Sequence, residues 1–463
     1  MSHLELTRRR LLKSTTAGVL GMSLPQCLAL QAQAASGNAP AKRVLVIYEQ
    51  GGMSQLDTFD PKPDVVSDHR SPYAPISTTV PGMQFTSLLP CTANVAHKLS
   101  VIRSMHHVVP GANEHPGGTQ YALSGMHPSY PISMPDLGCI VSKTIGTDCP
   151  SLPPYIMVPG NHEQNSASKT GFLPAADKVF KTGGHDLSDP KWTVADLLPI
   201  RENTSDRLSA RQQMLSRLDG RFSETGRKVD GMDRFYEQAF DTLTNSQVSK
   251  AFDLSTESPL VREKYGPGHR GACYLVGRKL IEAGVRFVTV DTIWPFSPDV
   301  PGGFLLNWDH HDLIYAPGSC GTVRNMAGGE GRYGIGHWVM TGSMDRAFAA
   351  LIDDLDQRGL LAETLVCLVT EFGRTPKLNK FGGRDHWTET YSIVMAGAGV
   401  PGGQIVGKSD ADGGYAIEDP HTPEEYGVTI YEKLGINRDI PLHDATNRPI
   451  FFGHAAEPIR AVM

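Results

Sequence analysis

Residues 360–387 read LLAETLVCLVTEFGRTPKLNKFGGRDHW, and in this stretch a short apolar segment runs directly into a carboxylate. The segment VCLV at residues 366–369 is typical of a buried parallel strand, and Glu371 stands where that strand would end. In open α/β sheets, ligand-binding groups gather at this carboxyl edge. Fifteen residues after Glu371, His386 follows in the glycine-rich segment GRDHW, which we expect to fold back over the same edge. One carboxylate and one imidazole begin a metal site without completing it.

Four further apolar segments are expected to be strands of the same sheet. They read RVLVIY at residues 43–48, LSVIRSM at 99–105, GVRFVTVD at 284–291 and YSIVMA at 391–396. Helical segments alternate with them, at residues 117–125, 265–283, 342–360 and 420–440. Alternating strands and helices predict an α/β fold with a mostly parallel sheet.

Charge and composition limit the classes of protein that fit. The chain has 463 residues, with 43 Lys and Arg against 49 Asp and Glu, for a formal net charge of -6. This balance provides no basic surface, so no nucleic-acid partner is expected. With 40% hydrophobic and 20% charged residues, the chain has the composition of an ordinary folded protein.

The domain organisation leaves two alternatives. Length alone suggests about three domains of roughly 150 residues each, whereas one enlarged α/β domain also fits. We expect the single domain, over residues 35–463. From Trp192 to about residue 260 the chain is rich in charged residues, and its apolar residues recur at near-helical spacing. This pattern predicts a helical insertion at about 192–260.

The N-terminus resembles a twin-arginine export signal. Residues 7–13 read TRRRLLK, an interrupted apolar stretch follows from 17 to 30, and Ala32-Gln33-Ala34 offers a cleavage site. These features predict a signal peptide at residues 1–34, export by the twin-arginine machinery, and a periplasmic or extracellular protein. A basic tail before an amphipathic segment is the alternative. No later segment has about 18 uninterrupted apolar residues, so no stable membrane span is expected in the mature form.

Two loops that follow predicted strands carry groups suited to ligand binding. Residues 106–115 hold three histidines, the last of them His115, and lead to a helix that begins at Gly117 and whose N–H groups suit a phosphate or sulfate. The alternative is that these histidines are surface or capping residues. Residues 307–312 read NWDHHD, in which Asp309 and His311 offer the oxygen and nitrogen donors that transition metals accept.

The candidate groups share one position in the predicted fold, because each lies just beyond the end of a predicted strand. The carboxyl ends of parallel strands meet at one edge of a sheet, so we expect these groups to converge there. They are Glu49, the loop at residues 107–119, Asp309, His311, Glu371 and His386.

Five motifs together resemble a known family. They read EQGGMSQLDTFDPKP, NEHPGGTQYALSG, NWDHH, TEFGRTP and GRDHW, in this order. The set is similar to an exported family of unknown function, often labelled sulfatase-like, within the alkaline phosphatase/sulfatase superfamily. The resemblance extends from about Arg43 to Gly453. It implies an alkaline-phosphatase-like three-layer α/β/α sandwich.

The resemblance also implies site residues. The metal ligands would be Glu49, Asp309, His311, Glu371 and His386. Thr119, at a helix start, is the candidate hydroxyl nucleophile, and His115 is a candidate metal ligand or acid. Arg374 is a candidate clamp for a sulfate or phosphate oxygen, and a bond from Arg374 to Glu371 that holds the loop is the alternative.

The sequence departs from the superfamily pattern at three points. Phe372 follows Glu371 where a histidine ligand is expected, Glu49 replaces an aspartate, and the Cys-x-Pro-x-Arg nucleophile motif of sulfatases is absent. The resemblance implies an exported hydrolase that uses a divalent metal (zinc, manganese or calcium) on a small-molecule or glycan ester of sulfate or phosphate. The departures leave an alternative, a catalytically degenerate protein that binds a glycan or a partner without hydrolysis.

Overall fold

The computed structural model describes residues 39–107, 109–128, 130–160, 169–183, 186–194, 246–292, 307–316, 333–453 and 456–463. The predicted signal peptide at residues 1–34 lies outside the described residues, as do positions 195–245 of the predicted helical insertion. Within the described ranges, no helix combines the length and the apolar character needed to cross a membrane.

An eight-stranded sheet forms the centre of the molecule, with the strand order β12-β4-β11-β8-β1-β7-β5-β6. Neighbouring strands are parallel except where β11 pairs with β4 and β8. The predicted α/β fold with a mostly parallel sheet is therefore confirmed. In chain order the strands are β1 (Arg43–Tyr48), β4 (Leu99–Met105), β5 (Tyr155–Pro159), β6 (Phe180–Lys181), β7 (Phe287–Asp291), β8 (Thr364–Val369), β11 (Tyr391–Ala396) and β12 (Gln404–Val406).

The sheet separates two hydrophobic cores. Successive side chains of a strand point to opposite faces, and β1 shows this directly. Leu45 and Ile47 pack in one core, whereas Val44, Val46 and Tyr48 pack in the other. A strand that is apolar on both faces must be covered on both, which explains why RVLVIY is an unbroken apolar run.

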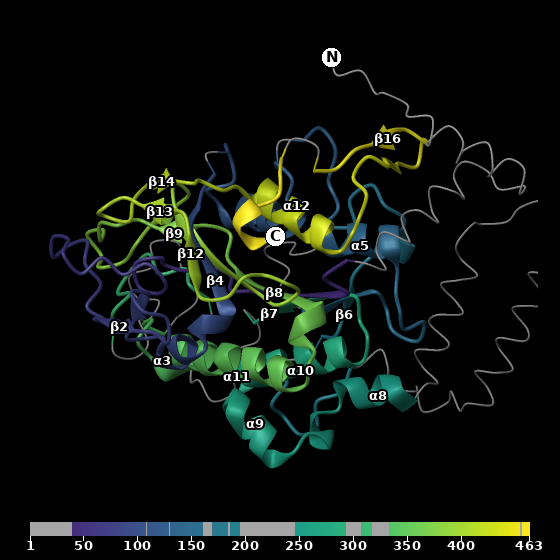
Figure 1. Ribbon diagram of the computed structural model, residues 1–463, viewed down its shortest axis with the longest axis horizontal. Coiled ribbons are helices and arrows are strands. Elements are labelled where there is room, and N and C mark those ends of the chain that lie inside the picture. Colours follow the sequence, from purple (N-terminus) through teal and green to yellow (C-terminus); the bar gives the residue numbers. More distant parts are fainter. Residues whose placement is uncertain are drawn as a thin grey trace, which may run out of the picture.

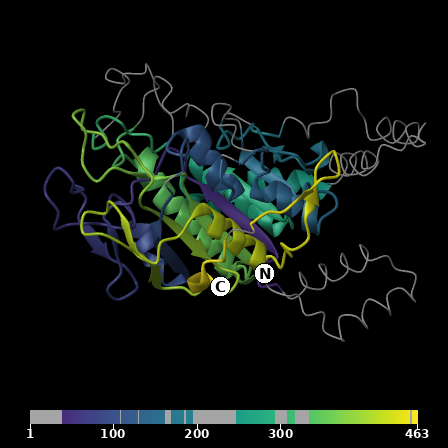
Figure 2. The same cartoon turned by 90° about the horizontal axis from the view of Figure 1, so that it is seen from above.

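Helices cover both faces of the sheet, as Figure 1 shows. The core that contains Leu45 also contains Phe348 and Leu351 of α11, and α10 packs beside it. The other core contains Ile140 of α5 and Ile430 of α12. Figure 1 shows the sheet between these two layers of helices, so the three-layer arrangement is also confirmed, and Figure 2 gives the view from above. The longer helices are α4 (His115–Ser124), α5 (Leu137–Ile145), α10 (His269–Glu282), α11 (Ser343–Gln357) and α12 (Pro423–Lys433).

Shorter elements complete the described part of the chain. A five-residue π-helix at Trp338–Gly342 leads into α11. The short α-helices are α3 (Pro90–Asn94), α8 (Ser246–Phe252) and α9 (Pro259–Tyr265), and the short strands are β2 (Pro75–Ser77), β3 (Gln84–Thr86), β9 (Gly373–Arg374), β10 (His386–Trp387), β13 (Lys408–Ser409), β14 (Ala416–Glu418), β15 (Leu442–His443) and β16 (Pro449–Ile450). Of the predicted helical insertion, α8 and the first residues of α9 are described.

The carboxyl ends of four strands lie at the same edge of the sheet. β1 is parallel to β7 and β8, and β4 runs in the same direction because both β4 and β8 are antiparallel to β11. The segments that follow β1, β4, β7 and β8 therefore leave the sheet at the same edge. These segments carry the candidate site residues, as the sequence predicts.

Candidate metal centre

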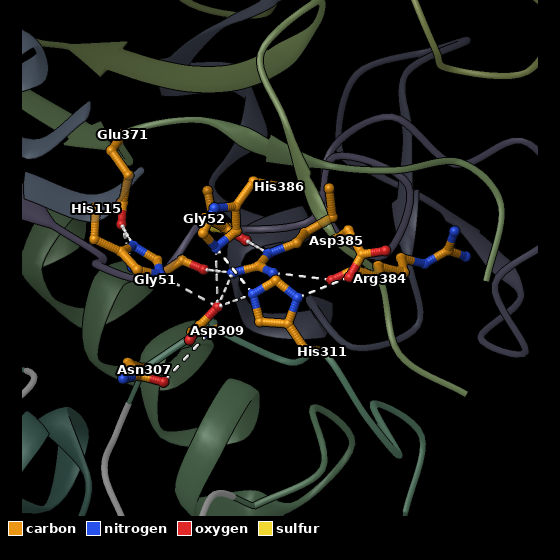
Figure 3. A network of polar contacts seen from close by, with 12 residues as sticks. Gly51, Gly52, His115, Asn307, Asp309, His311, Glu371, Arg384, Asp385 and His386 are labelled. Atoms are coloured by element: carbon orange, nitrogen blue, oxygen red, sulfur yellow. Dashed lines mark hydrogen bonds and ion pairs between the residues drawn. The ribbon is translucent and has the colours of Figure 1, made fainter. Parts of the chain in front are cut away.

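Three histidines and one aspartate meet beyond this edge of the sheet, as Figure 3 shows. His115, Asp309 and His386 each present one ligand atom, and these atoms lie within 4.8 Å of one another. The Nε2 atoms of His115 and His386 are both 3.2 Å from Oδ1 of Asp309. Nε2 of His311 is 2.9 Å from the same oxygen and 3.0 Å from Nε2 of His386. We call these four residues the His3Asp cluster.

Each member of the cluster comes from a segment that follows a strand. His115 is the first residue of α4, which begins after the loop that follows β4. Asp309 and His311 belong to the segment after β7. His386 lies in β10, which pairs antiparallel with β9 just after β8, so the hairpin returns it to the sheet edge.

The second ring nitrogen of each histidine is held by an oxygen acceptor. Nδ1 of His115 is 2.8 Å from Oε1 of Glu371, and Nδ1 of His311 is 2.8 Å from Oδ1 of Asp385. Nδ1 of His386 is 2.7 Å from the backbone oxygen of Asn113. Because a carbonyl oxygen only accepts, and an ionised carboxylate does the same, we assign the proton to Nδ1 in all three rings. The Nε2 lone pairs of the neutral rings then face Asp309.

This arrangement favours a cation. Three nitrogen lone pairs and a carboxylate oxygen repel one another at about 3 Å unless a proton or a metal ion lies between them. Histidine ligands of metals commonly donate their other ring N–H to a carboxylate or a backbone carbonyl, which fixes the tautomer. The outer contacts of His115, His311 and His386 follow this pattern.

The donor set fits a transition metal. Ligand atoms at the bond lengths of zinc lie roughly 3.3 Å apart. The separations of 2.9–3.2 Å between Oδ1 of Asp309 and the three histidines, and of 3.0 Å between His311 and His386, are close to this value. Three imidazoles and one carboxylate suit zinc and related ions. Calcium takes oxygen ligands, so the expectation of calcium is not supported by this donor set.

Burial and neighbouring charges shift the pKa values of Asp309 and His115 in the metal-free cluster. Burial acts to raise the pKa of Asp309, but Arg374 and the three histidines outweigh it and hold that pKa well below its usual range. For His115, burial acts to lower the pKa, yet Asp309 and Glu371 raise it to about 9. The metal-free cluster therefore carries a proton on His115 at neutral pH, and a bound metal ion would replace it.

Phe372 forms an apolar wall of the cluster. Its ring is fully buried, and its centroid lies 5.3 Å from that of His115 and 4.4 Å from that of His386. Two glycines make room for it, because a Cβ at Gly52 would lie 2.7 Å from the ring and one at Gly118 would lie 3.0 Å from it. The glycines of the GGM and PGG motifs thus accommodate the aromatic ring.

The sequence matches a known protein family over most of its length. The family described as "Protein of unknown function (DUF1501)" matches residues 41–463. The chain belongs to this family. Membership in the DUF1501 family agrees with the resemblance to an exported family of unknown function. Among curated proteins, the comparison found no match to this chain.

Solved structures with a similar arrangement share little sequence with this DUF1501 protein. The phosphonate monoester hydrolase SpPMH from Silicibacter pomeroyi is 10% identical, with a TM-score of 0.36 and coverage of 85% of this chain and 73% of that one. The PsFucS1 sulfatase from Pseudoalteromonas sp. is 10% identical, with a TM-score of 0.35 and coverages of 91% and 74%. The lipoteichoic acid synthase LtaP from Listeria monocytogenes is 10% identical, with a TM-score of 0.34 and coverages of 92% and 80%. Likenesses at this level do not show a shared activity.

Glu371 has a different contact from the predicted one. It was expected to bind metal directly, but its Oε1 accepts hydrogen bonds from the ring of His115 and, at 2.7 Å, from the backbone N–H of Gly51. The carboxylate is fully buried, and although burial acts to raise its pKa, the contacts with His115 and Gly51 lower it. Glu371 therefore orients the ring of His115 in the His3Asp cluster.

Glu49 is also placed differently from the prediction. The structure gives its carboxylate three donors, Arg270, Tyr274 and the indole of Trp308, and all of these residues are buried. The contacts come from α10 and from the residue before Asp309. The strand-end position of Glu49 is as expected, but its side chain turns toward α10 because of these partners.

Thr119 and Arg374 are buried within the protein. The hydroxyl of Thr119 is buried and 2.7 Å from Oη of Tyr48, which does not favour Thr119 as a nucleophile. The guanidinium of Arg374 donates to Oδ1 of Asp309 at 2.8 Å and to the backbone oxygens of Gly51 and Gly52. Arg374 therefore holds Asp309, and not Glu371 as the alternative had it, and its use as a substrate clamp stays a prediction.

Two residues of the site were missed by the sequence analysis. Asp385 precedes His386 in the GRDHW motif, and its adjacency to a candidate ligand was the available signal. Asp385 is fixed in turn by Asn379, whose Nδ2 donates to Oδ1 at 3.0 Å. Asn113 acts through its backbone oxygen, which leaves no signature in a sequence.

The protonated His115 predicts a pH dependence for the metal-free protein. A raised pKa stabilises the fold fully below the unfolded value of 6.5, and the stabilisation is lost as pH rises through about 9. In EDTA, the free energy of unfolding of wild type should exceed that of His115→Asn by on the order of 3 kcal/mol more at pH 6 than at pH 9.5. Urea titrations at both pH values measure this, and an equal difference at both would contradict it.

Proposed function

We propose that this protein is a metal-dependent hydrolase of sulfate or phosphate esters, with one divalent ion held by His115, Asp309, His311 and His386. The observation that carries the proposal is the set of three Nε2 atoms around Asp309, each on a ring whose Nδ1 is bound to an oxygen acceptor. Histidines that bind a metal ion commonly donate their other ring N–H to an acceptor of this kind.

The residues in and around the cluster would have different roles in the reaction. A divalent ion in this site supplies Lewis-acid chemistry for ester hydrolysis. Asp309 provides the negative ligand and is held in place by Arg374. Glu371 and Asp385 keep protons on the Nδ1 atoms of their histidines, and Phe372 excludes water from one side of the cluster.

Substrate would approach from the side of His311. The side chain of His311 is 46% exposed and that of its partner Asp385 is 54% exposed, whereas those of His115 and His386 are 20% and 13% exposed. An ester group entering along His311 therefore meets the cluster on its solvent side. A small-molecule or glycan ester is the substrate class that we propose.

The proposed location of the protein in the cell is based on its N-terminal sequence. We propose that the protein is exported through the twin-arginine pathway to the periplasm or beyond, because residues 7–13 and Ala32-Gln33-Ala34 have the order of an export signal. Export after folding would allow the His3Asp cluster to take up its metal before transport.

A second candidate is a protein that binds metal and a glycan or partner without hydrolysis. The observation that favours it is the burial of Thr119, whose hydroxyl is bound to Oη of Tyr48. The two candidates share the metal site and differ in turnover, so one experiment separates them.

The test combines metal content with hydrolysis. We expect the purified mature protein to contain about one zinc or manganese ion per chain and to hydrolyse an aryl sulfate or an aryl phosphate. EDTA should abolish turnover, and the metal should restore it. His386→Ala should lose both metal and turnover, whereas the matched variant His97→Ala, at an exposed histidine outside the cluster, should keep both. Metal without turnover on either ester would favour the binding protein, and no metal in wild type would contradict both candidates.

A further inference from the structure

Glu49 lies at the centre of a buried set of contacts. Its Oε2 accepts hydrogen bonds from Nη2 of Arg270 at 3.1 Å and from Nε1 of Trp308 at 2.9 Å, and its Oε1 accepts one from Oη of Tyr274 at 2.8 Å. Glu49 and its three partners are each at most 1% exposed. A buried carboxylate with a guanidinium and two further donors is fully compensated, so it has no need of a metal ion.

The same contacts fix the residue next to a proposed ligand. Trp308 immediately precedes Asp309, and its backbone N–H donates to the backbone oxygen of Gln50 at 2.9 Å. The chain passes so close to Gly51 that a Cβ there would lie 2.5 Å from N of Trp308 and 2.7 Å from N of Asp309. The indole and the backbone of Trp308 are thus both attached to the segment that follows β1.

Arg270 anchors this arrangement to the helical layer. It lies in α10 and also donates to the backbone oxygen of Met340, in the π-helix before α11, and at 3.0 Å to Oγ of Ser343. The guanidinium and Glu49 therefore form a fixed buried pair. Trp308, the residue before Asp309, is bound to this pair through Glu49.

We infer that Glu49 is a positioning residue for the metal centre, acting through Trp308 on Asp309. This inference rests on the proposed metal site and changes the role of Glu49 from ligand to support. A carboxylate accepts hydrogen bonds at both oxygens, whereas an amide must direct an N–H group toward one of the donors. Glu49→Gln can direct this N–H toward the hydroxyl of Tyr274, which also accepts, but it removes the negative charge and leaves the buried guanidinium of Arg270 without its ionic partner, so the position of Trp308 is no longer fixed.

The test uses three variants with matched changes. Glu49→Gln disturbs the whole set, and Trp308→Phe removes the indole N–H while keeping a large aromatic ring. Tyr274→Phe is the control, because it removes a hydrogen bond to the other carboxylate oxygen, Oε1, and leaves the bond to Trp308 intact. Zn2+ affinity is measured by competition with a chromophoric chelator, and the visible spectrum of the Co2+-substituted protein reports ligand geometry.

We expect Glu49→Gln and Trp308→Phe to bind Zn2+ about tenfold more weakly than wild type, with altered Co2+ spectra. Tyr274→Phe should stay within about twofold of wild type. Circular dichroism of the metal-free proteins verifies folding, and if Glu49→Gln does not fold, Trp308→Phe alone decides. Wild-type affinity and spectra for the variants, or equal loss in all three, would overturn the inference. Failure of wild type itself to bind Zn2+ would instead refute the proposed function.

Discussion

Asp309→Asn is expected to weaken Zn2+ binding by about 100-fold or more. Structural zinc sites have apparent binding energies of about 10–16 kcal/mol, so one of four ligands accounts for roughly 3 kcal/mol. Asparagine keeps the size of the side chain but removes the only negative charge of the His3Asp cluster. The buried guanidinium of Arg374, now 2.8 Å from Oδ1 of Asp309, would then repel the ion.

Isothermal titration of metal-free protein with Zn2+ measures this loss. Asp412→Asn is the matched control, because its carboxylate is 57% exposed and lies beside His69, away from the cluster. Asp385→Asn provides a graded comparison, since removal of an outer partner typically costs 10–100-fold. If Asp309→Asn bound Zn2+ as tightly as Asp412→Asn, the carboxylate would not be a ligand.

Gly383→Ala is expected to destabilise the fold and to displace a ligand at the same time. A Cβ at Gly383 would lie 2.1 Å from the backbone carbon of His311 and 2.3 Å from N of Asp312. Backbone atoms cannot rotate out of the way, so the segment that carries His311 must move. We expect a loss of about 3 kcal/mol of unfolding free energy and about tenfold weaker Zn2+ binding.

The neighbouring residue gives a matched control for this prediction. Gly382 has φ +71, but a Cβ there would meet no heavy atom within 4 Å. Gly382→Ala should therefore cost only the strain of a left-handed alanine, about 1–2 kcal/mol, and leave Zn2+ affinity unchanged. Urea denaturation and metal titration of both variants measure these effects. Equal affinities for the two variants would show that the close approach at Gly383 does not position His311.

Much of the fold could be predicted because its central strands are unbroken apolar runs. β1, β4, β7 and β11 fall within the predicted segments, and β8 begins two residues before the strand predicted at 366–369. The strands that were missed are short or lie toward the ends of the sheet. β6 has two residues and β12 has three, whereas β5 ends in Pro159, and none of these runs shows a distinct period.

The site was predicted in its position but not in its contacts. Strand ends placed Glu49 and Glu371 at the correct edge, but the direction of a side chain depends on partners that are distant in sequence. Glu49 turns toward Arg270, 221 residues away, and Glu371 turns toward His115, 256 residues away. The sequence left His115 between several roles, because only the folded chain brings its Nε2 to Asp309.

The most direct test of the metal centre is a crystal structure of the natively purified protein with anomalous diffraction data collected on both sides of the zinc and manganese absorption edges. We predict a single anomalous peak about 2.0–2.2 Å from Nε2 of His115, Nε2 of His386 and Oδ1 of Asp309. Nε2 of His311 should complete the set, and Glu49 should stay bound to Arg270 and Trp308. A fully ordered cluster without a peak, or a peak bound to other residues, would contradict the account.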